Sequence, residues 1–185
     1  MPNYVSPDEV RDTFSRANRV LVIGCSGSGK TTFALKLAQR YALEYQSIDR
    51  DVRWLPGWQV RNRDEQRLIL KELAQRDRWV MDGSGASTFD IRVPRAEFIV
   101  WLRVPRFVAI LGVAKRVMEN YGRVRAAMAE GCPEPFPDQE FLSYIWNFER
   151  KSAPDFVKQI DRFGPNVPVA VLRLRKEYDL LIPGT

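Results

Sequence analysis

Short, mostly apolar runs alternate along this chain with longer stretches in which apolar residues recur every three or four positions. The short runs lie at 19–23, 45–48, 78–81, 97–102 and 167–172. The longer stretches lie at 31–41, 64–76, 106–121, 139–150 and 155–163. Short apolar runs bounded by turn residues predict buried strands, and the wider spacing predicts amphipathic helices. Because the two kinds of segment alternate, we expect an α/β fold with a parallel sheet of about five strands and helices on both faces.

The helical spacing also predicts which side chains face the core. In 31–41 the inward face would consist of Phe33, Ala34, Leu37, Ala38 and Tyr41. In 106–121 it would consist of Phe107, Ile110, Leu111, Ala114, Val117 and Met118. We further expect a short helix at 5–14, with Ser6 as its cap and Pro7 at its first position. Residues 51–62 and 122–138 carry clustered Gly, Pro or Trp and predict irregular segments, and 177–181 predicts a terminal helix.

The segment GCSGSGKT, residues 24–31, follows the first of these strands and opens a helix. It fits the pattern GxxxxGK[ST], with Gly24, Gly29, Lys30 and Thr31 at the required places. Glycine permits positive φ and close approach of a phosphate, so that consecutive backbone N–H groups form an anion nest at the helix N-terminus. We therefore predict a loop that binds the phosphates of ATP. Its residues would be Gly24, Cys25, Ser26, Gly27, Ser28, Gly29, Lys30, Thr31 and Thr32.

Two carboxylates, Asp49 and Asp82, follow predicted strands. Ligands of parallel sheets bind beyond the carboxyl ends of the strands, so we expect both near the phosphate loop. The Thr31 hydroxyl and Asp82 are predicted ligands of Mg²⁺, the alternative being that Asp82 only begins a D-G turn. Lys30 would contact the β- and γ-phosphates. Asp49 would accept a proton from the hydroxyl of an acceptor, the alternative being a solvated loop carboxylate.

Basic residues concentrate between positions 103 and 125. A phosphoryl group in transfer carries charge on its equatorial oxygens, which a planar guanidinium neutralises well. Arg116, Arg123 and Arg125 flank a Gly/Pro-rich segment that would close over a nucleotide and exclude water, so we predict them to be catalytic. Arg173 follows the last strand and would border the base, the alternative being surface charge. For Trp54 and Trp58 we favour packing in the core or the lid, the alternative being a stacking surface for a ring-shaped substrate.

Composition narrows the function further. The chain has no histidine, which excludes Ser-His-Asp and Cys-His mechanisms, and its two cysteines form neither a disulfide framework nor a zinc pattern. Cys25 is therefore interpreted as a small loop residue. No run of 18 apolar residues and no signal peptide is evident, so we expect a cytoplasmic protein without a membrane span. The net charge of +6 keeps a DNA partner as an alternative, but the basic cluster favours a site for anionic nucleotides.

This order of features resembles the bacterial adenylate-kinase-like proteins known as DNA topology modulation proteins, a family of P-loop nucleoside and nucleotide kinases. The resemblance spans about 20–181. Its specific segments are WLPGW (54–58), VMDGSGASTFDIRVPRAE (80–97), AEGCPEPF (129–136) and FLSYIWNFERKS (141–152). It implies a three-layer P-loop NTPase fold with a small lid, and binding of ATP and Mg²⁺. The chain departs from the adenylate-kinase pattern at Gly112, where such lids carry an arginine, and at Arg103, where the strand often ends in aspartate.

These observations predict one domain over 1–185, with a core at about 19–104 and 165–185 and a helical lid region at about 105–163. The favoured function is a kinase that moves the γ-phosphoryl group of ATP to a small acceptor such as a nucleotide or nucleoside. Two alternatives stay open. One is a nucleotide-binding regulatory protein that acts on DNA or a DNA-bound partner with little turnover. The other is an NTPase without an acceptor.

Overall fold

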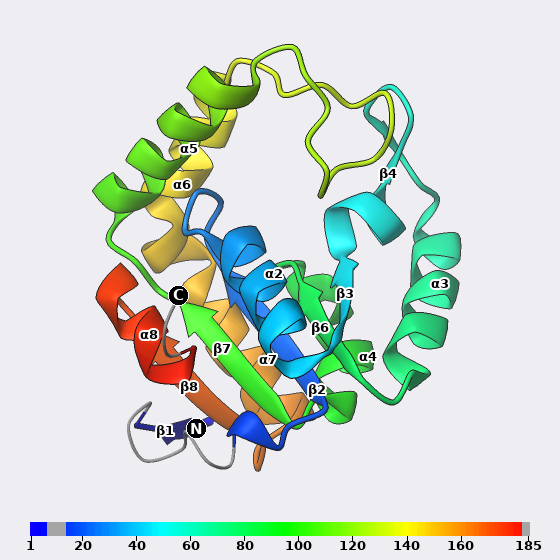
Figure 1. Ribbon diagram of the computed structural model, residues 1–185, viewed down its shortest axis with the longest axis vertical. Helices are drawn as coiled ribbons and strands as arrows, with labels where there is room; N and C mark the ends of the chain where they lie inside the picture. Colours follow the sequence, from blue (N-terminus) through cyan, green and yellow to red (C-terminus); the bar gives the residue numbers. More distant parts are fainter. Residues whose placement is uncertain (7–13, 183–185) are drawn as a thin grey trace.

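A computed structural model describes residues 1–6 and 14–182 of the chain. Its main sheet has six strands in the order β1-β8-β7-β2-β6-β3, and every neighbouring pair is parallel (Figure 1). The strands are β1 (Asn3–Val5), β2 (Arg19–Gly24), β3 (Glu44–Ser47), β6 (Trp79–Asp82), β7 (Phe98–Leu102) and β8 (Pro168–Leu172). The predicted α/β fold with a parallel sheet is confirmed.

The sheet has one strand more than predicted. The additional strand, β1, pairs with β8 at an edge of the sheet and is only three residues long. Its sequence, Asn-Tyr-Val, carries no apolar run, because an edge strand has a neighbour on one side only and is less buried. Val5 lies in this strand rather than in the predicted helix at 5–14. The rest of that prediction falls on residues 7–13, outside the described residues.

Helices cover both faces of the sheet (Figure 1). They are α2 (Lys30–Tyr41), α3 (Arg63–Gln75), α4 (Phe89–Arg92), α5 (Arg106–Asn120), α6 (Gln139–Lys151), α7 (Ala153–Phe163) and α8 (Tyr178–Leu181). Alternate residues of β2 point to opposite sides: Val20 and Val22 pack with α2 and α8, whereas Leu21 and Ile23 pack with α3 to α7. This alternation divides the core into two apolar layers, as in a three-layer fold. Among the described residues, no helix is both long and apolar enough to cross a bilayer.

The predicted inward face of α5 is correct only in part. Val117 is buried and Ile110 packs partly buried against the core, as predicted. Phe107, Leu111 and Met118 are 61%, 68% and 86% exposed, and Ala109 and Val113 are buried in their place. Small residues line this face because the helix approaches the backbone of the phosphate loop too closely for large ones, so the apolar periodicity alone did not identify the whole buried face.

The segment at 51–62 is more ordered than the predicted loop. It contains the end of a π-helix (Ile48–Arg53) and a small antiparallel hairpin of β4 (Trp54–Leu55) and β5 (Gln59–Val60). Residues of 122–138 lie against this hairpin: the Gly57 amide donates to the Gly131 carbonyl at 3.0 Å. Trp54 and Trp58 pack on an apolar cluster of Met128, Ala129 and Cys132. The packing interpretation of the two tryptophans is confirmed by these contacts.

Candidate active site

The phosphate loop joins β2 to α2 at the carboxyl edge of the sheet. Gly27 and Gly29 have φ angles of 79° and 92°, which L-residues with a side chain rarely adopt. The Lys30 ammonium folds back over the loop and donates to the carbonyl of Cys25 at 2.8 Å. Ser28 is fully buried, and its hydroxyl has no hydrogen-bond partner among the described residues. A glycine-rich turn that leads into the N-terminus of α2, with an ammonium beside it, has the backbone form of an anion site.

Thr31 and Asp82 meet at the mouth of this loop. The Thr31 hydroxyl donates to Oδ2 of Asp82 at 2.6 Å, and the Tyr45 hydroxyl reaches the same oxygen at 3.4 Å. Asp82 is only 5% exposed, and its Oδ1 atom is buried without a hydrogen-bond partner among the described residues. Burial raises the pKa of the Asp82 carboxyl, and the nearby Lys30 ammonium opposes that rise. The sequence placed these two residues together correctly, although nothing in it indicated that a carboxylate oxygen would be left unpaired.

The residues fit a bound Mg²⁺, which takes oxygen ligands and keeps several from water and phosphate. A hydroxyl and one carboxylate supply two such oxygens. No group of three or more His, Cys, Asp or Glu side chains with metal-binding geometry exists in the part of the chain that the structure describes. A cation here would consequently depend on phosphate oxygens for much of its coordination.

The loop after β6 is held by groups that sequence reasoning missed. The Gly24 amide donates to the Ser84 hydroxyl at 3.0 Å, which ties this loop to the phosphate loop. Arg92 is fully buried and donates to the carbonyls of Gly83 and Gly85 at 2.7 and 2.8 Å. Burial lowers the pKa of Arg92 to about 10. The only signal in the sequence was an arginine among the apolar residues of FDIRV, which is too common to be informative.

Asp49 and Asp51 differ in their surroundings. The Asp51 carboxylate forms an ion pair with Arg50 at 2.6 Å and accepts from the Ser47 amide at 2.8 Å. Asp49 is exposed, and no hydrogen bond or ion pair of its side chain is found within the described residues. Its charge acts on Asp82, Arg116 and Tyr144, which lie on three different elements, β6, α5 and α6. Asp49 is thus the carboxylate that remains available to a ligand.

Two of the predicted catalytic arginines converge on one carboxylate. Arg116 and Arg125 contact the two oxygens of the buried Glu134, with Nε–O distances of 2.8 and 2.7 Å. Arg116 also donates from a terminal nitrogen to the hydroxyl of Ser26, in the phosphate loop, at 3.3 Å. Arg123 is exposed, and its backbone carbonyl accepts from the Glu134 amide. The structure therefore brings Arg116 and Arg125 together on Glu134, with Arg116 reaching the phosphate loop, and does not place the Arg123 side chain in that cluster.

The remaining predicted residues lie as follows. Cys25 is buried, which raises the pKa of its thiol to about 11, so the thiol stays protonated at neutral pH. Thr32 is exposed in the first turn of α2. Arg173 is exposed just after β8, and its amide donates to the Glu177 carboxylate at 2.6 Å. Nearer the loop, the Tyr178 hydroxyl donates to the Ser28 carbonyl at 2.8 Å, a contact that sequence reasoning missed.

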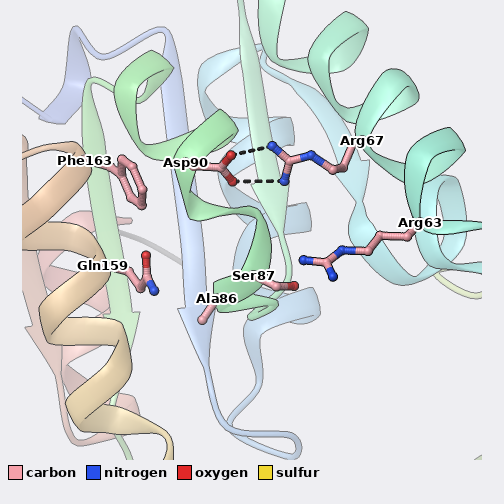
Figure 2. Close-up of a pocket in the computed structure, with 7 residues that line it drawn as sticks. All are labelled: Arg63, Arg67, Ala86, Ser87, Asp90, Gln159 and Phe163. Carbon is pink, nitrogen blue, oxygen red and sulfur yellow. Dashed lines mark hydrogen bonds and ion pairs between the residues drawn. The ribbon is translucent and has the colours of Figure 1, made fainter.

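A separate pocket of about 330 Å³ lies between α3, α4 and α7 (Figure 2). Arg67 and Asp90 form a two-pronged ion pair at its wall, and the Arg63 guanidinium extends toward Ser87. Its remaining walls come from Ala86, Gln159 and Phe163. None of the predicted site residues lines this pocket, so it is distinct from the phosphate-loop site.

Comparison with solved structures identifies the fold. The chain is similar to shikimate kinase from Acinetobacter baumannii, solved in complex with shikimate (TM-score 0.59, 16% identity, 93% of each chain covered). It is also similar to shikimate kinase from Bacteroides thetaiotaomicron (TM-score 0.54, 18% identity, 90% of this chain and 94% of that one). A third neighbour is deoxyadenosine kinase from M. mycoides with bound dATP (TM-score 0.50, 12% identity, 89% and 97%). These likenesses show that the chain shares the fold of these kinases. No protein-family model and no curated protein matches the sequence.

Proposed function

We propose that this chain is an ATP- and Mg²⁺-dependent kinase that transfers the γ-phosphoryl group to a hydroxyl group of a small acceptor. The observation that carries the proposal is the cluster of Lys30, Thr31 and Asp82 at the mouth of the phosphate loop, with a buried and unpaired oxygen on Asp82. A buried carboxylate oxygen without a partner is costly, and a divalent cation would satisfy it. The fold shared with solved kinases supports the same function.

In the phosphoryl transfer each group of residues would have its own role. The loop amides and Lys30 would bind the β- and γ-phosphate oxygens, and Thr31 and Asp82 would hold Mg²⁺. The bound cation would supply positive charge to the phosphate oxygens. The oxygen of the acceptor hydroxyl would bond to the γ-phosphorus while the bond between that phosphorus and the departing ADP breaks. Asp49 would accept the proton that the hydroxyl loses. Arg116, Arg125 and, after a movement of its exposed side chain, Arg123 would neutralise the charge of the transferring group.

The acceptor would be a small hydroxylated molecule. The neighbours' names record shikimate and deoxyadenosine, which share hydroxyl groups and small size. A nucleoside or nucleotide acceptor agrees with the resemblance to adenylate-kinase-like proteins. Arg173 would border the base of the nucleotide, with ATP as the default because no guanine-reading N-K-x-D pattern is present. We place the protein in the cytoplasm, where ATP is available.

The test is ADP release from Mg-ATP with a panel of nucleosides, nucleoside monophosphates and small hydroxylated metabolites. Lys30→Ala is the inactive variant, and Lys36→Ala, on the exposed side of α2, is the matched control. We expect one acceptor class to raise turnover well above background in the wild type and in Lys36→Ala, and not in Lys30→Ala. ATP binding with turnover that no acceptor raises would contradict the kinase proposal and favour an NTPase or a regulatory protein.

The second candidate is a nucleotide-binding regulator of DNA topology. The net charge of +6 and the resemblance to topology modulation proteins favour it. Neutralisation of phosphates releases counterions, so its signature would be an affinity for duplex DNA that falls steeply with salt. Binding of duplex DNA that is weak and unchanged by added ATP would count against this candidate.

A further inference from the structure

Glu134 is a buried carboxylate between two exposed prolines. It is 3% exposed, although Pro133 and Pro135 beside it are exposed. Its backbone is fixed on both sides, because its amide donates to the Arg123 carbonyl at 2.9 Å and its carbonyl accepts from the Gly122 amide at 3.0 Å. A buried carboxylate must be paired to be tolerated. The segment therefore directs this side chain toward specific cations.

Those cations are held in a particular way. The Arg116 Nε donates a hydrogen bond to Oε1 of Glu134, whereas the Arg125 Nε lies 2.7 Å from Oε2 as an ion pair without hydrogen-bond geometry. A guanidinium carries five N–H donors in a planar fork, so an Nε contact leaves the terminal nitrogens for other acceptors. In Arg116 one of them already reaches Ser26 of the phosphate loop. Glu134 thus pairs with both guanidinium groups, of which Arg116 reaches the phosphate loop and Arg125 extends a terminal nitrogen to the Met128 sulfur at 3.9 Å.

The positive charges of Arg116 and Arg125 explain why the two arginines need a carboxylate between them. Burial lowers the pKa of Arg116, and the charge of Arg125 lowers it further, whereas Glu134 raises it. Two like charges in a partly buried site repel each other, and without a carboxylate between them they would separate or turn to solvent. With Glu134 in place the trio carries one net positive charge, which keeps it attractive to phosphate.

We propose that Glu134 is a positioning residue that makes Arg116 and Arg125 act as one unit on the γ-phosphate. This inference rests on the proposed kinase function. The competing explanation is that Glu134 only fastens the segment at 122–138 to α5. The two explanations differ in what a loss of the carboxylate charge would change. If Glu134 positions the arginines, its loss would weaken the binding of the γ-phosphate specifically. If Glu134 only fastens the segment, its loss would lower the stability of the fold and the affinity for ADP and ATP alike.

The test is Glu134→Gln, which keeps the size and one acceptor oxygen but cannot pair with two guanidinium ions. Glu130→Gln, an exposed carboxylate of the same segment, is the matched control. We expect Glu134→Gln to lower kcat by about 10- to 100-fold, the usual range for lost alignment or charge stabilisation, with little change in the acceptor KM. Affinity for a non-hydrolysable ATP analogue should fall about 10-fold while affinity for ADP stays within about 2-fold.

A double-mutant cycle sharpens the result. If the three side chains act as one unit, Arg116→Lys added to Glu134→Gln should cost much less than the sum of the single losses. Equal losses of ADP and ATP-analogue affinity, or a full-strength kcat in Glu134→Gln, would overturn the proposal. If Glu134→Gln folds poorly, Arg125→Lys provides the second variant, because it keeps the charge and removes Nε. Arg125→Lys should then lose affinity for the ATP analogue and keep its affinity for ADP.

A failure of the kinase proposal can be distinguished from a failure of the proposal on Glu134. A wild-type protein that binds ATP but transfers nothing would refute the kinase. The comparison of ADP with the ATP analogue would still decide whether Glu134 positions the arginines.

Discussion

Gly112 of α5 packs directly on the backbone of Gly27 in the phosphate loop. A Cβ atom at Gly112 would lie 2.1 Å from the Gly27 carbonyl oxygen, and one at Gly27 would lie 2.0 Å from the carbonyl oxygen of Ala109. A helix and a loop can approach this closely only where both lack side chains. An arginine, like any residue with a Cβ atom, would not fit at Gly112 without a shift of one of the two backbones. The contact also sets the position of Arg116, one turn further along α5, which reaches Ser26 of the loop.

We expect Gly112→Ala to destabilise the protein, although alanine in a helix is ordinarily better than glycine by about 1 kcal/mol. The added methyl would meet backbone, which cannot move aside, and such overpacking costs about 1–3 kcal/mol. The loop would shift with the helix, so ATP affinity should fall as well. Chemical denaturation and ATP titration measure the two effects.

Gly85→Ala is the control for this substitution. Its Cβ would meet only the Thr88 hydroxyl at 3.7 Å, and its φ of −63° suits alanine, so stability should change little. A Gly112→Ala protein as stable as the control would show that α5 can move away from the loop without cost.

Asp82→Asn should stabilise the nucleotide-free protein at neutral pH. Burial raises the pKa of Asp82 in the folded state, so the folded protein holds the proton more tightly than the unfolded chain does. The ionised carboxylate therefore costs stability once the pH exceeds its unfolded pKa of about 3.9, and asparagine removes that cost. A gain of about 1 kcal/mol would raise Tm by about 2–4 °C in a domain of this size.

The same variant should lose the stabilisation that Mg-ATP gives the wild type. Thermal melts with EDTA or Mg-ATP measure both effects, and Asp77→Asn, an exposed carboxylate, serves as control. The Tm advantage in EDTA should disappear below about pH 4, where the wild-type carboxyl is neutral in both states. A lower Tm for Asp82→Asn at neutral pH would mean that the ionised carboxylate is already compensated without a cation.

Arg92→Met should destabilise the protein. It would remove the Arg92 donor from the buried carbonyl of Gly83, and a buried acceptor left unsatisfied costs about 1–3 kcal/mol. Arg95→Met is the control, because Arg95 is exposed and makes one contact, to the Ala74 carbonyl at 3.3 Å. Urea denaturation compares them, and equal midpoints would refute the structural role of Arg92.

Trp58→Ala should loosen the segment at 127–133 with little effect on the rest of the fold. Trp58 packs on Met128, Ala129 and Cys132, and its indole donates to the Pro133 carbonyl at 3.1 Å. Losing these contacts would weaken the segment locally by about 1–2 kcal/mol. Hydrogen exchange should then accelerate at 127–133 and not in β2 or β7. Trp146→Ala, on the exposed side of α6, should leave these amides unchanged.

The fold was predictable because its signals are local. The apolar runs and helical spacing marked the core strands and most of the helices, since burial on both faces of a parallel sheet demands them. What escaped prediction was short or depended on partners: the three-residue edge strand β1, the hairpin of β4 and β5, and the burial of Ala109 and Val113 on α5. Phe107 and Leu111 are exposed but have the same spacing as core residues, so periodicity alone predicted wrongly that they face the core.

For the site, the sequence by itself determined the loop from Gly24 to Thr31 and the place of Asp82. A strand, a glycine-rich turn and a helix start fix a phosphate cradle locally, and parallel strands end at one edge. Only the tertiary structure decided that Glu134 pairs Arg116 with Arg125, that Arg92 is buried on the loop carbonyls, and that Gly112 touches Gly27. These contacts join residues far apart in the chain, and the identity of a charged or small residue does not reveal its partner until packing brings the two together.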